Sequence, residues 1–318
     1  MSKRILTEQQ KRRIKHNKSN KPEENLLTGR VISHNGYLLS VKNNNGDLIK
    51  CHFKNNLGDI VTGDYVSYSE THGKGIIHNV INRKNILKRP NKYAKYKNKA
   101  IAANIDQIFI VIAVEPEPIE QYIDRYIVAS ELMNIKPIII LNKIDLLTRH
   151  NQDSINNALE IYRQLGYDII LNSNNEMLHN DLINALKNNC SIFIGQSGVG
   201  KSALLNQIIG TGTTKVGEIS DSNNKGKHTT TKSQLYKLGD IELIDSPGIR
   251  EFDLWDISHN ELISGFIEIN QYAKECGFRN CAHSENEKNC AVMMAIENNQ
   301  INKSRLNSFL KIKEEIES

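Results

Sequence analysis

One short segment of this 318-residue chain strongly restricts the fold of its surroundings. Residues 195–202 read Gly-Gln-Ser-Gly-Val-Gly-Lys-Ser, between the apolar run 192–194 and an apolar helical pattern at 203–209. A strand, glycine-rich loop and helix of this kind surround phosphate oxygens with backbone amides and direct the positive end of the helix at them. A glycine-rich turn before an ordinary helix fits the complete pattern poorly. The segment therefore predicts an α/β domain that binds a nucleoside triphosphate.

The residues of this loop have different expected roles. Its glycines let the backbone approach phosphate oxygens closely. Lys201 is expected to reach the β- and γ-phosphates, and the Ser202 hydroxyl is expected to hold Mg²⁺. The predicted phosphate-binding residues are Gly195, Gln196, Ser197, Gly198, Val199, Gly200, Lys201 and Ser202.

A second motif identifies the base. Asn142, Lys143 and Asp145 belong to an Asn-Lys-x-Asp tetrad after the apolar run 137–141, so we expect them at the carboxyl end of a buried strand. The Asp145 carboxylate can accept hydrogen bonds from guanine N1 and N2, which adenine cannot supply. The Lys143 stem is expected to lie over the base, and Asn142 to connect this loop to the phosphate loop. Alone, the tetrad also fits a solvated turn; beside a phosphate loop it predicts guanine.

The order of the motifs is unusual. The tetrad precedes the phosphate loop, the reverse of the order in Ras-like proteins, which indicates a circularly permuted GTPase. A third motif of the form Asp-x-x-Gly follows the apolar run 241–244. Asp245 is expected to hold Mg²⁺ through water, and the Gly248 amide to sense the γ-phosphate. Because this switch ends the predicted GTPase domain, its movement is expected to reach the C-terminal domain directly.

The polar stretch 225–231 lies where a switch loop supplies a threonine to Mg²⁺. Thr229 and Thr230 are both candidates for that ligand. Ile249 follows the Asp-x-x-Gly motif, where Ras-like enzymes place a glutamine that orients the attacking water. An aliphatic side chain cannot orient water, so slow intrinsic hydrolysis that a partner accelerates is expected. His228 is the best local group to position the water, although a loop histidine is more often only solvated.

Four stretches together carry a family resemblance: 225–231, the run Asp-Ser-Pro-Gly-Ile-Arg-Glu-Phe at 245–252, and the upstream Asp106-Gln107 and Asp124-Arg125-Tyr126. They resemble the bacterial small ribosomal subunit biogenesis GTPases of the RsgA family, over roughly residues 25–295. The resemblance implies an OB domain, a permuted GTPase domain and a zinc domain. It also implies binding to the maturing 30S subunit and its 16S rRNA, with ribosome-stimulated GTP hydrolysis.

The resemblance extends to single residues. It implies a catalytic role for His228. It also implies that the loop after 169–171 contacts guanine O6 through a backbone amide. This chain has Ser173-Asn174 where the family usually has Ser-Ala, and asparagine can still supply that amide.

A group of soft ligands lies near the C-terminus. Three cysteines and a histidine fall within fifteen residues, at Cys276, Cys281, His283 and Cys290, while Cys51 and Cys190 lie elsewhere. A closed Cys₃His set favours one tetrahedral structural Zn²⁺ without an open catalytic position. Reduced thiols beside a surface histidine are the alternative. A segment this short has little core, so the metal is expected to contribute its folding free energy.

Apolar periodicity predicts three folded parts. Short apolar runs at 30–32, 37–41, 48–51, 65–68 and 75–77 predict a five-stranded OB-fold barrel, whose aromatic residues are mostly core. Six apolar runs between 108 and 244, with helical patterns between several of them, predict a doubly wound α/β sheet. Helical patterns near 258–275 and 291–316 flank the cysteine cluster. The expected parts are a basic disordered arm (1–24), an OB-fold RNA-binding domain (25–84), a basic linker (85–99), a circularly permuted GTPase domain (100–256) and a mainly helical zinc-binding domain (257–318).

Charge indicates the kind of partner. The whole chain has a formal net charge of +5, and its basic excess lies in the first 22 residues. Such an arm binds phosphate backbones by counterion release, so RNA is the natural partner. The linker 85–99 is equally compatible with phosphate contact and with plain solvation. Without a long apolar stretch or a leader, we expect a cytoplasmic monomer that does not bind membranes.

These observations favour a GTP hydrolase of late 30S maturation that is released after hydrolysis. An RNA-binding assembly module with a structural nucleotide is a second hypothesis, and a permuted GTPase of the large subunit is a third. The intact phosphate loop, switch and tetrad favour the first.

Overall fold

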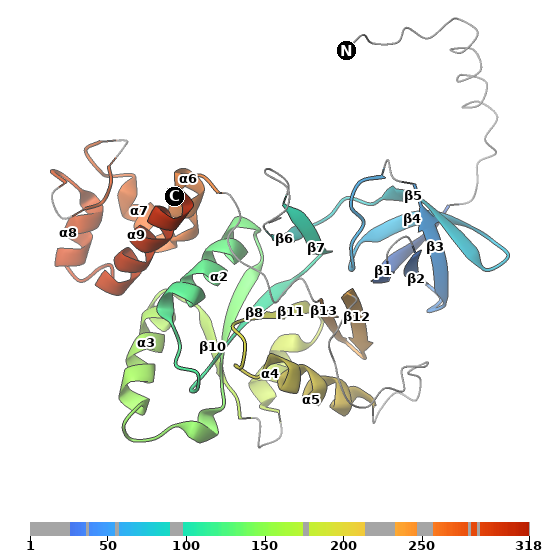
Figure 1. Cartoon of the computed structure of the whole chain (residues 1–318), viewed down its shortest axis with the longest axis horizontal. Coiled ribbons are helices and arrows are strands. Elements are labelled where there is room, and N and C mark those ends of the chain that lie inside the picture. The colour runs from blue at the N-terminus through green and yellow to red at the C-terminus, as the bar shows by residue number, and fades with distance from the viewer. Residues whose placement is uncertain are drawn as a thin grey trace, which may run out of the picture.

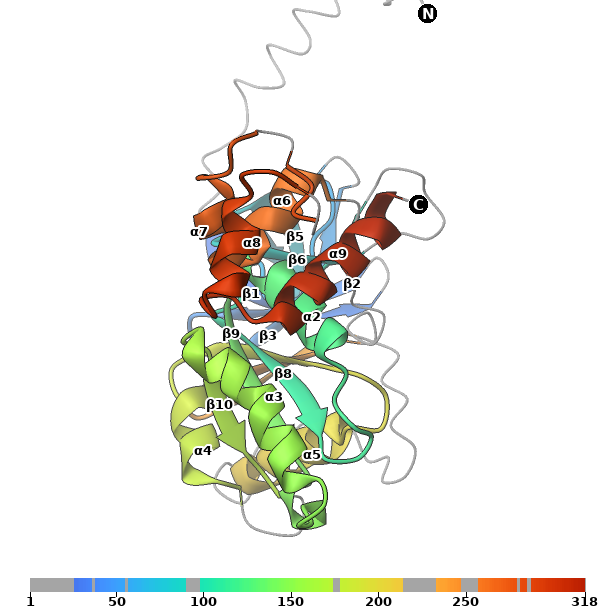
Figure 2. The ribbon, with the colours of Figure 1, turned by 90° about the vertical axis from the view of Figure 1, so that its left-hand side faces the viewer.

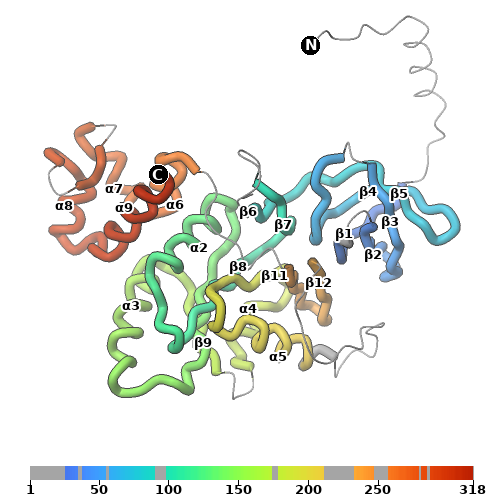
Figure 3. The backbone as a smooth tube through the Cα atoms, viewed as in Figure 1, coloured from blue at the N-terminus to red at the C-terminus, as the bar shows by residue number. Residues whose placement is uncertain are grey.

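The computed structural model describes residues 26–35, 38–54, 57–89, 98–173, 178–213, 233–246, 257–278, 281–284 and 287–317. Figure 1 shows a β-barrel, a central α/β layer structure and a group of C-terminal helices. Figure 3 shows that the chain passes through them in that order. Among the described residues, no helix combines the length and apolarity needed to cross a bilayer.

The N-terminal barrel is built from five strands with alternating burial, as the sequence pattern predicts. β1 pairs with both β2 and β4, and β3 pairs with β5, so the sheet closes on itself. Val31, Leu39 and Tyr68 are fully buried in its core, whereas Tyr65 is 43% exposed. The strands are β1 (Leu27–Asn35), β2 (Leu38–Asn43), β3 (Leu48–Phe53), β4 (Tyr65–Thr71) and β5 (Lys74–Val80). The expected OB-type barrel is therefore confirmed.

The central sheet is doubly wound. Its strand order is β10-β9-β8-β11-β13-β12, with parallel pairs except between β12 and β13. The strands are β8 (Gln107–Ala113), β9 (Lys136–Asn142), β10 (Asp168–Leu171), β11 (Cys190–Ile194), β12 (Ser233–Leu238) and β13 (Ile241–Asp245). Strands β8, β9 and β11 are mostly apolar and almost continuously buried, as expected for a parallel sheet that helices cover on both faces.

Alternate residues of β8 enter two different cores. Ile108 and Ile110 pack with α2 and α3 on one face, and Phe109 and Val111 pack with α4 and α5 on the other. The helices are α2 (Glu120–Leu132), α3 (Gln152–Gln164), α4 (Asn180–Leu186) and α5 (Lys201–Thr213). The two-sided burial explains the unbroken apolar runs in the sequence.

Two features differ from the sequence expectations. The ends of segment 85–99 lie in a two-stranded hairpin of β6 (Ile86–Arg89) and β7 (Lys99–Ala103), where the basic composition had suggested only a linker. Each long C-terminal helical pattern is divided into two helices. These are α6 (His259–Gly265), α7 (Ile267–Ala273), α8 (Ala291–Glu297) and α9 (Lys303–Glu317). Phe266 breaks the first pattern, and Asn299 in the left-handed conformation breaks the second.

The C-terminal helices pack on the central sheet through α2. Helix α2 contacts α6 and α9 (Figure 2). A Cβ atom added at Gly265 of α6 lies 2.5 Å from Val128 Cγ1 of α2, so the close approach requires glycine. At the β12 edge of the central sheet, β1 of the barrel pairs with β12. One sheet therefore runs from the central domain into the barrel.

Candidate nucleotide site and metal centre

The phosphate loop connects β11 to α5, as its sequence predicts. Gly195, Gly198 and Gly200 all have positive φ. A Cβ atom at Gly195 lies 2.1 Å from the Val111 carbonyl oxygen, so only glycine lets the loop cross β8 here. A cavity of about 490 Å³ opens over the loop, and it is lined by Gly195, Ser197, Gly198, Gly200, Lys201, Ser202 and Ala203.

The phosphate-loop lysine is held by its own loop. Lys201 Nζ donates hydrogen bonds to the carbonyl oxygens of Gly195, at 2.7 Å, and Gln196, at 2.5 Å. Ser202 follows it in the first turn of α5. These contacts fix the ammonium group beside the cavity, so its positive charge is placed to attract an anionic ligand there.

The base tetrad lies directly against the phosphate loop. Asn142 ends β9, and its Nδ2 donates a hydrogen bond to the Val199 carbonyl oxygen at 2.9 Å. Lys143 adopts a left-handed conformation, and its Nζ donates to the Glu115 carbonyl oxygen at 2.6 Å. The permuted order therefore brings 142–145 and 195–202 together in space, as a shared site requires.

The loop after β10 completes this group. Ser173 Oγ donates a hydrogen bond to Asp145 Oδ1 at 2.8 Å. Asn172 Nδ2 donates a hydrogen bond to Asn142 Oδ1 at 2.9 Å. Sequence reasoning missed Asn172 and Glu115. The only signal for Asn172 was a polar residue directly after an apolar strand.

The switch residues are described only in part. Asp245 ends β13, which pairs in parallel with β11, so its backbone lies at the same edge of the sheet as the phosphate loop. Five predicted residues lie outside the described part of the chain: Asn174, His228, Thr229, Thr230 and Gly248.

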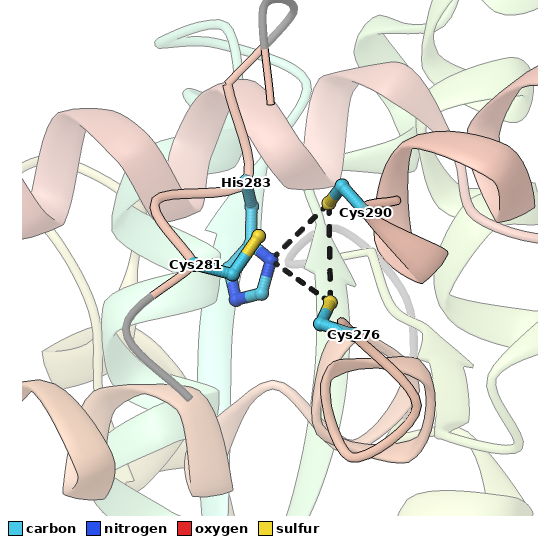
Figure 4. A group of neighbouring side chains, drawn as sticks. All are labelled: Cys276, Cys281, His283 and Cys290. Carbon is cyan, nitrogen blue, oxygen red and sulfur yellow. Dashed lines mark hydrogen bonds between the residues drawn. The ribbon is translucent and has the colours of Figure 1, made fainter. Parts of the chain in front are cut away.

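The four predicted metal ligands come together near the C-terminus (Figure 4). Their ligand atoms all lie within 4.8 Å of one another. His283 Nδ1 is 3.7 Å from Cys276 Sγ and 3.5 Å from Cys290 Sγ, and the two sulfur atoms are 4.0 Å apart. The edges of a tetrahedral zinc site measure about 3.3–3.8 Å. The cluster, which also contains Cys281, therefore fits one tetrahedral ion.

The surroundings of this cluster also suit a metal. Burial, with nearby His259 and Lys313, lowers the pKa of His283, which keeps the imidazole neutral for coordination. Burial raises the pKa of Cys290 to about 12, so without a cation its thiol keeps its proton at neutral pH. The Met293 backbone N–H points at Cys290 Sγ, 3.5 Å away, at the start of α8. The buried Cys290 thiol is thus poorly suited to carry charge without a cation.

A buried ion-pair network joins the C-terminal helices to α2. Arg305 of α9 pairs with Asp124 of α2, and its Nε donates to Glu268 Oε1 of α7 at 2.7 Å. Tyr162 of α3 donates to Asp124 Oδ1 at 2.8 Å. The Arg305 guanidinium lies 4.5 Å above the Phe266 ring centroid. Asp124 was noticed in the sequence only within a family motif, and its partners lie too far along the chain for a motif to predict them.

Known proteins share this architecture. The family model described as RsgA GTPase matches residues 80–255. A protein of Hahella chejuensis named small ribosomal subunit biogenesis GTPase RsgA is 43% identical over 91% of this chain and 84% of its own length. A protein of the same name from Saccharophagus degradans is 38% identical over 98% of this chain and 97% of its own.

Solved structures agree. The crystal structure of YjeQ from Thermotoga maritima has a TM-score of 0.74 and 30% identity, and the match covers 92% of this chain and 98% of that one. YloQ, described as a circularly permuted GTPase, has a TM-score of 0.72 and 28% identity over 94% of this chain and 98% of its own. The order of tetrad, phosphate loop and switch strand along the chain is the permutation that this description names. The chain therefore belongs to the RsgA family of circularly permuted GTPases.

Proposed function

We propose that this protein hydrolyses GTP during late maturation of the 30S ribosomal subunit, that the subunit stimulates hydrolysis, and that hydrolysis releases the protein. The hydrogen bond from Asn142 to Val199 carries the nucleotide part of the proposal, because it joins a guanine-reading loop to a phosphate loop. The names of the relatives support the ribosomal part.

We assign the site residues as follows. Asp145 reads the guanine edge, Lys143 covers the base, and the 173–174 backbone contacts guanine O6. Lys201 and the loop amides bind the phosphates, and bound Mg²⁺ neutralises phosphate charge during phosphoryl transfer. The proposed Mg²⁺ ligands are Ser202 and a threonine at 229 or 230, and Asp245 is proposed to bind the ion through water. Gly248 senses the γ-phosphate, and His228 positions the attacking water. The full nucleotide set is Asn142, Lys143, Asp145, Ser173, Asn174, Gly195, Gln196, Ser197, Gly198, Val199, Gly200, Lys201, Ser202, Thr229, Thr230, Asp245 and Gly248.

The metal of the C-terminal cluster is proposed to be one structural Zn²⁺. Cys276, Cys281, His283 and Cys290 form a closed Cys₃His set, which leaves no open position for substrate. The ion's expected role is to hold the segments that carry its ligands against helices whose apolar residues, such as Phe266 and Phe309, are buried in one core with α2.

Partners and boundaries follow from the same assignment. The arm 1–24 and the barrel 25–84 are proposed to contact 16S rRNA, with 85–99 as a connector. Residues 100–256 form the proposed GTPase domain, and 257–318 the zinc-binding domain. We propose a cytoplasmic monomer whose ligands are GTP and GDP.

The test is GTP turnover with and without purified 30S subunits. Stimulation by 30S but not by 50S subunits is expected, and its absence overturns the proposal. His228→Ala is expected to lose most of the stimulated rate while it still binds GDP. Lys201→Ala is expected to abolish turnover; a variant that functions on the ribosome like the parent indicates a structural nucleotide instead.

A further inference from the structure

Asn172 joins the loop after β10 to the tetrad loop. It follows β10, and its backbone N–H donates to the Leu141 carbonyl oxygen while its own carbonyl accepts from Ile144. Both Asn172 and Asn142 are almost fully buried, at 1% and 0% exposure. Neither side chain is therefore placed for direct contact with solvent, and their hydrogen bonds form away from competing water.

The direction of each hydrogen bond in this group follows from one fixed acceptor. The Val199 carbonyl can only accept, so the Asn142 atom that faces it is Nδ2. Asn142 Oδ1 consequently faces Asn172, and the atom of Asn172 that meets it must be a donor, Nδ2. A chain of two hydrogen bonds, each donated by an asparagine Nδ2, therefore runs from the loop after β10, through the tetrad, to the phosphate loop.

The second polar atom of Asn172 argues against a purely structural role. Asn172 Oδ1 is buried without a hydrogen-bond partner among the described atoms. An unpaired buried oxygen costs stability, so this asparagine is a poor choice for packing alone. Its benefit lies in the donor that orients Asn142.

We infer that Asn172 is a positioning residue for guanine nucleotide binding, which acts by holding the Asn142 amide in the orientation that links the base loop to the phosphate loop. This inference rests on the proposed nucleotide site. A preorganised pair of loops binds with a smaller ordering cost, so loss of the donor weakens nucleotide affinity more than it weakens the fold.

Three variants of the full-length protein separate the donor from the side-chain shape. Asn172→Leu keeps the branching and the number of heavy atoms and removes the donor, and it is expected to weaken GDP binding about tenfold. Asn172→Asp places an acceptor against Asn142 Oδ1 and is expected to weaken binding further. Asn172→Thr restores a donor and is expected to recover affinity to within about threefold of the parent. Fluorescently labelled GDP is the probe, with IDP as competitor to report base reading.

A double-mutant cycle tests whether Asn172 acts through Asn142. In an Asn142→Ala background, Asn172→Leu is expected to have no further effect on GDP affinity. Additive losses overturn the inference, as does parent-like affinity in both Asn172→Leu and Asn172→Asp. The matched control is Asn85→Leu, which removes an asparagine that bonds the Ile105 backbone far from the loops. It is expected to lower the melting temperature and leave GDP affinity unchanged. A parent protein that binds no GDP overturns the proposed function itself, and this inference with it.

Discussion

The two junctions that flank the central sheet are built differently. On one edge the barrel joins the central sheet through two residue pairs between β1 and β12, with Ser33 opposite Gln234 and His34 opposite Ser233, and a further backbone bridge joins Thr62 to Ala102. The ion pair between Arg30 and Glu242 supports this edge, and its side chains are 12% and 20% exposed. On the other side the C-terminal helices are fixed to α2 by charges that are almost fully buried.

This difference has an energetic consequence. A few backbone hydrogen bonds and a partly solvated ion pair contribute little, and they can be rearranged at small cost. A buried network opposes rearrangement, because separating its partners leaves charge in a low-dielectric interior. The barrel junction is therefore the softer of the two, although it adjoins the strand that follows the predicted switch loop. The C-terminal junction is the stiffer, although the predicted switch leads into it.

Removal of the metal is expected to have the largest effect on this comparison. The apparent binding free energy of a structural zinc site in zinc-finger peptides is about 10–16 kcal/mol, and many small metal-binding domains are unfolded without the ion. When a chelator has removed the metal, the backbone amides of α6 to α9 are expected to lose protection from hydrogen exchange, while the amides of β8 to β11 remain protected. Full protection of 287–317 after verified metal removal contradicts a metal-dependent junction.

The same site predicts a pH dependence. The buried Cys290 thiol has a pKa raised to about 12 without metal, so it must lose a proton when the ion binds. Acidification favours the protonated thiol, and metal affinity is expected to fall as the pH is lowered from neutrality. A chromophoric chelator that competes for the ion at several pH values measures this. Affinity that does not change with pH excludes coordination by thiolates.

Loss of Arg305 is expected to have the next largest effect. Arg305→Met leaves Asp124 and Glu268 buried without their cation, which typically costs about 3–5 kcal/mol. Urea unfolding measures the change in free energy. The control is Arg163→Met, which removes a 3.4 Å ion pair with Glu160 between exposed side chains and is expected to cost less than about 0.5 kcal/mol. Equal effects of the two variants remove the contrast between the junctions.

Loss of Arg30 is expected to cost about 1 kcal/mol, because its pair with Glu242 is only partly buried. Its guanidinium also lies 5.1 Å from the Tyr65 ring centroid, so some packing is lost. Lys84→Met is the control at the same junction, since its pair with Asp106 is largely exposed and is expected to contribute nothing measurable. If Arg30→Met lowers the free energy of unfolding as much as Arg305→Met does, the two junctions are equally stiff.

The smallest effect is expected at the start of α6. Hydrogen bonds from the backbone and hydroxyl of Ser258 lower the pKa of Glu261 from 4.5. A carboxylate with a lowered folded-state pKa stabilises the fold above its unfolded pKa, and the contribution is lost as pH falls through the folded value. At pH 7 the parent is therefore expected to have a larger free energy of unfolding than Glu261→Gln. This difference is expected to shrink below about pH 4.5. A difference that grows in acid contradicts the capping interaction.

Much of the fold was predictable because its signals are local. Barrel strands such as β3 alternate buried and exposed residues, and the central strands β8, β9 and β11 are mostly apolar runs, so both sheets are visible in short windows. The hairpin of β6 and β7 was not predicted, because the basic residues between and within its strands gave the segment the composition of a solvated linker. The division of the C-terminal helical patterns was also missed, because Phe266 breaks a pattern whose apolar periodicity continues through it.

The sequence by itself determined the chemistry of the loops: which residues can meet phosphate, guanine and a soft metal ion, and in what order they follow one another. Only the tertiary structure decided which side chains support those loops. Asn172 contacts Asn142 at the ends of the neighbouring strands β10 and β9, and Arg305 pairs with Asp124, which is 181 positions away in the chain. The reason is physical: a motif is fixed by neighbours along the backbone, whereas a buried polar partner is selected by packing between elements that are distant in sequence.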